Sequence, residues 1–97
     1  MWIIRWRHTT TGRQEILREG FAVGKVLQFE REEDAFRLIE ILRRSATKLA
    51  YPLAFTTQRY AGDRREKQKL VKDNTWDRTV NDLAAGMEIE AQAAAVR

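Results

Sequence analysis

The side chains in this sequence that could carry out chemistry are few. The chain has no cysteine, and His8 and Ser45 are its single histidine and its single serine. The lack of cysteine excludes disulfides, thiolate metal sites and cysteine nucleophiles, and one imidazole cannot build a zinc site alone. Ser45 falls in a connection after a predicted helix, with no nucleophile motif around it, so we do not expect a catalytic pair with His8.

Acidic and glycine-rich patterns give no stronger lead to an active site. The densest acidic cluster is Glu30, Glu32, Glu33 and Asp34, and it lies where a helix is predicted to begin, a place where the helix dipole favours carboxylates. The five glycines are scattered, and none stands in the strand, Gly-x-Gly, helix order of a phosphate loop. We therefore expect a protein that is not an enzyme and that uses no cofactor and no metal.

Arginines form the first candidate for a binding function. Arg5 and Arg7 alternate with apolar residues in a predicted strand, Arg13 lies at the following turn, and Arg18 lies on the next predicted strand. A basic ribbon of this kind can enter a DNA groove and contact phosphates and base edges. Ion pairs with glutamates of the same hairpin, across the strands of a solvated sheet face, explain the pattern as well.

The second candidate is a basic segment at residues 59–73. It has six basic side chains against three acidic ones, within a chain whose net charge is +4. Tyr60 could stack on a base, and a flexible basic arm gains affinity from phosphate contacts by releasing counterions. The alternative is a hydrated loop or helix face whose own carboxylates dilute the charge. The candidate contacts are Arg59, Arg64, Arg65, Lys67, Lys69 and Lys72.

Length and composition fit a single domain over residues 1–97. The chain has 97 residues, of which 43% are apolar and 33% charged, as in ordinary globular proteins. It contains no apolar run of the roughly 20 residues that a membrane span needs, and its N-terminus lacks the long apolar segment of a signal peptide. We expect a cytoplasmic protein that does not enter a membrane.

Alternation of side chains predicts an N-terminal hairpin. Trp2, Ile4 and Trp6 recur at every second position of residues 1–8, which is the period of a strand with one buried face. A glycine-containing turn follows, and residues 14–21 are rich in residues that suit a strand. The two segments are expected to pair in antiparallel fashion.

Two further strands are predicted later in the chain. Residues 25–29 follow a pair of glycines that indicates a bulge or a tight turn, and they should form a short third strand. Residues 49–55 alternate again and predict a fourth strand. Pro52 lacks an N–H group, so this strand should lie at an edge of the sheet or be irregular.

Helical periodicity predicts two helices. Residues 31–44 repeat apolar side chains at intervals of three and four, and residues 45–47 are expected to form the connection that follows. Residues 60–74 are polar and predict a loop or a weakly ordered arm, with a helical turn at 65–72. The last helix is expected at residues 75–95.

These elements predict an α+β fold of order β-β-β-α-β-α. An antiparallel sheet of three or four strands should carry helix 31–44 on one face, with helix 75–95 packed across it or against a second copy. The expected core is formed by Trp2, Ile4, Trp6, Leu17, Phe29, Phe36, Ile39, Leu42, Leu53 and Phe55.

The run WIIRWRHTTTGR, which leads through short strands to FEREEDAFRLIEILRR, resembles the arm-type N-terminal DNA-binding domain of phage tyrosine integrases. The resemblance covers residues 2–44. It implies a three-stranded sheet that is set against one helix and inserted into DNA, with Arg5, Arg7, Arg13 and Arg18 on the reading face. The predicted fourth strand departs from that family, and the order of elements equally suits small binding proteins of phages and mobile elements.

Two functions follow as expectations. The first is a non-enzymatic nucleic-acid-binding protein that contacts phosphates through the sheet arginines and the basic arm. The second is a protein-interaction module, an adaptor or inhibitor of the phage or mobile-element kind, which acts as a homodimer. A small core leaves the apolar stripe of the last helix free to pair with a second copy. The expected dimer contact is Trp76, Val80, Leu83 and Met87.

Overall fold

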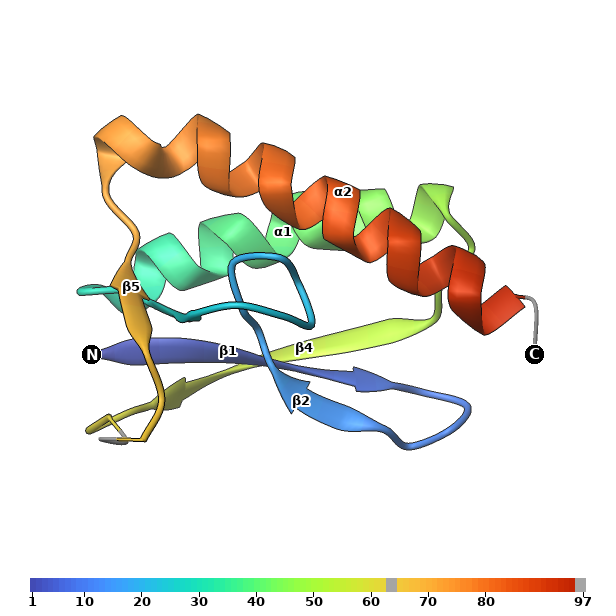
Figure 1. The fold of residues 1–97 in the computed structure, drawn as a ribbon, viewed down its shortest axis with the longest axis horizontal. Coiled ribbons are helices and arrows are strands. Elements are labelled where there is room, and N and C mark those ends of the chain that lie inside the picture. The colour runs from blue at the N-terminus through green and yellow to red at the C-terminus, as the bar shows by residue number, and fades with distance from the viewer. Residues whose placement is uncertain (63–64, 96–97) are drawn as a thin grey trace.

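The computed structural model describes residues 1–62 and 65–95 and shows an α+β fold. The elements follow one another in the predicted order, with one further strand before the last helix. In Figure 1 both helices lie on the same side of the main sheet, and none of the described residues forms a helix over its other face. The elements are β1 (Trp2–His8), β2 (Gln14–Ile16), β3 (Val26–Gln28), α1 (Glu32–Lys48), β4 (Leu53–Arg59), β5 (Gln68–Leu70), the 3-10 turn η1 (Asp73–Thr75) and α2 (Trp76–Ala95).

The main sheet has the strand order β2-β1-β4, and both strand pairs are antiparallel. Trp6 of β1 stands opposite Glu15 of β2 and Phe55 of β4, so these three side chains share the face toward the helices. Trp6 is only 1% exposed, and Ile4 on the same face is fully buried. The strand predicted at residues 1–8, with its tryptophans facing the core, is therefore confirmed.

A second sheet pairs β3 with β5 in parallel. It adjoins β1 through Trp2 and Phe29, whose main chains exchange two hydrogen bonds of 2.8 Å. The prediction of a loop or helical turn at residues 65–72 is thus wrong at Gln68–Leu70, which form β5. The strand is too short and too polar to give a signal of its own, and it forms because β3, far away in the chain, offers a free edge.

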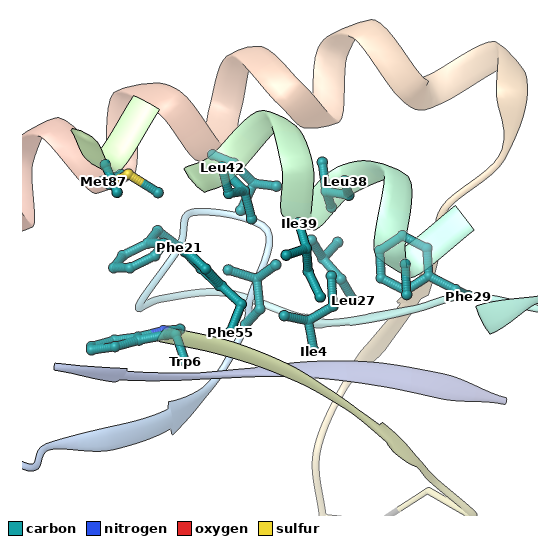
Figure 2. Close-up of a cluster of buried hydrophobic side chains, with 14 of the residues drawn as sticks. Ile4, Trp6, Phe21, Leu27, Phe29, Leu38, Ile39, Leu42, Phe55 and Met87 are labelled. Atoms are coloured by element: carbon teal, nitrogen blue, oxygen red, sulfur yellow. The ribbon is translucent and has the colours of Figure 1, made fainter. Parts of the chain in front are cut away.

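Both helices contribute to one core above the main sheet. α1 contacts β1 and β4, and α2 contacts α1. Figure 2 shows Ile4, Trp6 and Phe55 facing the buried side chains of the helices, among them Leu42 and Met87. Burial of an apolar face by each helix stabilises the fold at roughly 25 cal/mol per Å² of apolar surface removed from water.

α1 is longer than predicted. It continues to Lys48, through the connection expected at residues 45–47. Ala46 extends the buried stripe of the helix, and the Thr47 hydroxyl donates a hydrogen bond of 2.9 Å to the Arg43 carbonyl. These residues therefore add packing and a local hydrogen bond to the helix. The sequence prediction ended the helix before them because they include no large apolar side chain.

Two strands have other bounds than predicted. β2 ends at Ile16, and the following residues leave the main sheet for the irregular segment before β3. β4 starts at Leu53, because Leu49 caps the end of α1 and Ala50 turns the chain with a φ of 52°. Pro52 directly precedes β4, and β4 is an edge strand, as the proline predicts.

The segment between β2 and β3 carries an aromatic ring into the core. Phe21 is fully buried with a φ of 71°, and its ring stacks on Trp6 with ring centroids 4.7 Å apart. α2 crosses this segment at Gly86, where a Cβ atom would collide with the carbonyl group of Gly20. The close approach accounts for a glycine in mid-helix, where it costs about 1 kcal/mol relative to alanine.

The predicted core is largely buried, with differences at its margins. Phe36 is 52% exposed because it lies on the side of α1 that faces away from the sheet, and Trp2 and Leu53 are only partly buried. Leu83 and Met87 are fully buried in the chain's own core. A dimer contact through these two side chains, as the sequence predicts, would require α2 to leave that core.

Candidate nucleic-acid interface

The face of the main sheet that points away from the helices, here called the open face, is polar and basic. The strand register places Arg5 and Arg7 there, together with Gln14 of β2 and with Thr56 and Gln58 of β4. Among the described residues that pair in this sheet, none on the open face is acidic. Its apolar members are Ile3, Ile16 and Ala54, and because Ile3 is only 1% exposed, this end of the face is covered by the rest of the chain.

Arg5 and Arg7, the first predicted site residues, lie together on the open face. Nε of Arg5 donates a hydrogen bond of 2.8 Å to Oε1 of Gln58. The side chain of Arg7 is exposed, and it makes no hydrogen bond or ion pair with residues that the structure describes. A hollow of about 150 Å³ lies beside the two arginines, and it is also lined by Trp6, Gln14, Ala54 and Thr56.

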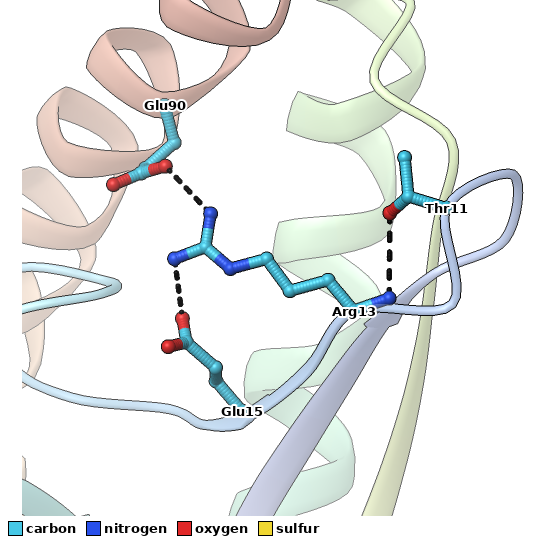
Figure 3. Close-up of polar contacts among 4 residues, drawn as sticks. All are labelled: Thr11, Arg13, Glu15 and Glu90. Carbon is cyan, nitrogen blue, oxygen red and sulfur yellow. Dashed lines mark hydrogen bonds and ion pairs between the residues drawn. The ribbon is translucent and has the colours of Figure 1, made fainter.

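Arg13, the third predicted residue, lies on the helix side of the sheet instead. Figure 3 shows its guanidinium between Glu15 and Glu90, at ion-pair distances of 2.8 and 3.3 Å. The same group lies 5.3 Å from the centre of the Trp6 ring. Burial acts to lower the pKa of Arg13, but the two carboxylates outweigh it and raise the pKa above the ordinary value. Arg13 thus links the β1–β2 turn to α2 and is separate from the open face.

Arg18 is engaged by a carboxylate from a distant segment. Its Nη1 and Nη2 donate hydrogen bonds of 3.0 Å to the two carboxylate oxygens of Glu66, and Nη1 also donates to the Gly24 carbonyl. Hydrogen bonding to Glu66 raises the pKa of Arg18, and the hydrogen bonds and charge of Arg18 hold the pKa of Glu66 below its ordinary value. This bidentate pair ties the segment before β5 to the segment after β2, and it occupies the guanidinium.

The structure distributes the predicted basic arm over several elements. Arg59 ends β4, with its guanidinium 5.7 Å from the centre of the Trp2 ring. Lys69 lies in β5 and pairs with Glu19 at 3.8 Å. Arg65, Lys67 and Lys72 are exposed, Tyr60 is half-buried, and Arg64 lies outside the described residues. Two of the six predicted contacts therefore belong to strands rather than to a flexible arm.

The sequence prediction missed Gln14, Thr56 and Gln58 as neighbours of Arg5 and Arg7. Residues 56–59 are all polar, so no alternation marks the continuation of the strand, and only the register with β1 places Thr56 opposite Arg5 and Gln58 opposite Ile3. The position of Gln14 follows from the register of the hairpin, in which it stands opposite Arg7. Only the pairing of β1 with both neighbours shows that all these side chains share a face.

The described residues offer no metal site. Within residues 1–62 and 65–95, no three acidic or histidine side chains are grouped so that they could hold a metal ion. The helices in these ranges are too short or too polar to cross a membrane. Comparisons with protein-family models, with curated proteins and with solved structures found no match to this chain. The resemblance to arm-type domains stays a sequence-based prediction.

Proposed function

We propose that this protein binds nucleic acid through the open face of the β2-β1-β4 sheet. The observation that carries the proposal is the pair Arg5 and Arg7 on a face that no helix covers and that has no carboxylate in its registered pairs. Arginine binds phosphate oxygens through charge-assisted hydrogen bonds. Each neutralised phosphate also releases counterions, which adds affinity that does not depend on the base sequence.

The shape and chemistry of the open face favour duplex DNA. β1 and one neighbouring strand, with axes about 4.8 Å apart, form a two-stranded ribbon of the kind that a major groove about 12 Å wide admits. The amide groups of Gln14 and Gln58 and the hydroxyl of Thr56 can bond to phosphates or base edges. The registered pairs of this face include no aromatic side chain on which the bases of a single strand could stack.

The remaining predicted contacts take other roles in this proposal. Arg13 and Arg18 stabilise the fold through their carboxylate partners and do not contact DNA. Lys67 and Lys72 are exposed cations that add long-range attraction to a polyanion. For a nucleic-acid-binding protein of this kind, the cytoplasm stays the proposed location.

Chemical-shift mapping tests the proposal. A generic DNA duplex is added at low salt to the isotope-labelled full chain, and the expected shifts concentrate on β1, β2 and β4. Arg5→Gln combined with Arg7→Gln should weaken binding by about tenfold or more, since each removes a charge-assisted contact. Arg43→Gln combined with Arg44→Gln on α1 removes the same charge from the helix side. No binding at micromolar concentration, or equal weakening by both pairs, would overturn the proposal.

A second candidate is interaction with a protein partner or a second copy through the helix side. It is favoured by two apolar side chains, Phe36 on α1, which is 52% exposed, and Ile89 on α2, which is 67% exposed. Because Leu83 and Met87 are enclosed, the contact would use these exposed side chains. Sedimentation at tens of micromolar tests the second copy, and a strictly monomeric mass would contradict it.

A further inference from the structure

The hollow on the open face results from a small residue next to large ones. On β4 the residue paired with Arg7 is Ala54, whose methyl group leaves the space beside the arginine unfilled. Trp6 also lines the hollow, and because its ring lies on the other face of the sheet, its main chain forms the floor. The hollow offers about 150 Å³, well above the roughly 10–15 Å³ that a single water molecule needs. A phosphate group fits this space.

The polar groups around the hollow have unused hydrogen-bonding capacity. The side chains of Arg7, Gln14 and Thr56 are exposed, and they form no hydrogen bond to the part of the chain that the structure describes. Arg5 uses Nε to bond Gln58, which leaves its Nη1 and Nη2 as a fork. Such a fork matches two oxygens of a tetrahedral anion. The second arginine, about 6.7 Å along the strand, supplies a further charge.

We propose that this hollow is a site for a single phosphate group, held by Arg5 and Arg7 with hydrogen bonds from Thr56 and Gln14. Gln58 is a positioning residue that fixes the Arg5 guanidinium through Nε. The ligand chemistry is that of a phosphate oxyanion, which is either free phosphate or one phosphodiester of a nucleic-acid backbone. The inference deepens the proposed function, and its phosphodiester form rests on that function.

Titration with inorganic phosphate tests the site itself. The isotope-labelled full chain is titrated at constant ionic strength, with chloride as the reference anion, and saturable shifts are expected at the residues lining the hollow. Ala54→Leu fills the hollow and leaves every charge in place, so it should weaken phosphate binding by about tenfold, a loss equal to one charge-assisted hydrogen bond. Ala85→Leu, at an exposed position of α2, is the matched control and should bind phosphate like the wild type.

Arg7→Gln provides a second test that leaves the core untouched, and it should also weaken phosphate binding by about tenfold. Shifts that grow linearly and equal those in chloride would overturn the site. Wild-type phosphate affinity in a folded Ala54→Leu variant, or in Arg7→Gln, would overturn it as well.

A duplex distinguishes the two sources of the phosphate. If the hollow holds a backbone phosphodiester, Ala54→Leu should reduce the salt dependence of duplex binding by about 0.9 in the slope of log K against log salt. If Ala54→Leu loses phosphate binding but keeps the wild-type slope for duplex binding, the site binds free phosphate. Saturable phosphate binding without any duplex binding would overturn the proposed function and leave the phosphate site supported.

Discussion

The indole of Trp6 stacks on the ring of Phe21, with the centroids 4.7 Å apart and the planes inclined by 17°. Trp6 belongs to β1, whereas Phe21 comes from the irregular segment that α2 crosses at Gly86. The stack therefore joins the central strand to the segment on which the last helix rests. The same strand carries Arg5 and Arg7 on its other face. Packing of Trp6 and Phe21 in the core therefore fixes the position of the strand that presents the two arginines.

Phe21→Ala should lower the free energy of unfolding by about 3–5 kcal/mol, because it leaves a cavity and removes the stack on Trp6. Urea denaturation measures this loss. Val23→Ala in the same segment is the control, since Val23 is 68% exposed, and it should change stability by less than about 0.5 kcal/mol. Equal, small effects of both substitutions would show that the segment does not pack on β1.

Gly86→Ala should destabilise the protein by about 1–3 kcal/mol, although alanine is the better helix former by about 1 kcal/mol. The added Cβ would collide with the Gly20 carbonyl, which cannot move aside like a flexible side chain. Thermal denaturation gives the sign of the change. Ala85→Gly, one residue earlier and exposed, should show only the ordinary cost of glycine, about 1 kcal/mol. If Gly86→Ala instead stabilised the protein, α2 would not approach the Gly20 carbonyl closely.

Leu83→Glu should unfold the chain, because it places a charge without a partner at a fully buried position. Circular dichroism and sedimentation read out the result. Ile89→Glu, on the exposed side of the same helix, should leave the fold intact. If Leu83→Glu instead gave a folded monomer from a dimeric wild type, the stripe predicted from the sequence would be a dimer contact after all.

Glu66→Gln should lower the free energy of unfolding, because it weakens the ion pair between the segment before β5 and the segment after β2. This effect should depend on pH. The hydrogen bonds and charge of Arg18 lower the pKa of Glu66 in the folded protein, so its ionised form favours folding. That contribution is complete above the ordinary glutamate pKa of about 4.3 and is lost as the pH falls through the lower folded value.

Urea denaturation over a range of pH follows this effect. Wild type should be more stable than Glu66→Gln at neutral pH, and the difference should shrink below about pH 4.3 and in high salt. Glu88→Gln, at an exposed position of α2, is the matched control. A difference between wild type and Glu66→Gln that grows as the pH falls would contradict the ion pair.

Local patterns were enough to predict much of the fold. Alternation predicted which face of β1 is buried, and helical spacing predicted α1 and α2. Both patterns are local, because each element repeats its buried side chains with its own period. Pro52 correctly indicated an edge strand. What local pattern missed was pairing between distant segments: β5 forms only against β3, and β2 ends early because Phe21 leaves the sheet to stack on Trp6.

The candidate site shows the same limit. Alternation placed Arg5 and Arg7 on one face, since both lie on a single regular strand. It could not show that Arg13 and Arg18 are bound to Glu90 and Glu66, which lie 77 and 48 residues away in the chain. It also missed Thr56 and Gln58, because residues 56–59 are all polar and only their pairing with β1 shows that the strand continues there.

The salt dependence of duplex binding tests the central claim most directly. The logarithm of the binding constant falls against the logarithm of salt concentration with a slope of about −0.9 for each neutralised phosphate. Combining Arg5→Gln with Arg7→Gln should reduce the magnitude of this slope by about 0.9, that is, by the one phosphate that the two arginines hold together. The charge-matched pair Arg43→Gln and Arg44→Gln on α1 should leave the slope unchanged. A wild-type slope in the Arg5 and Arg7 variant, or an equal reduction by the α1 pair, would contradict the account.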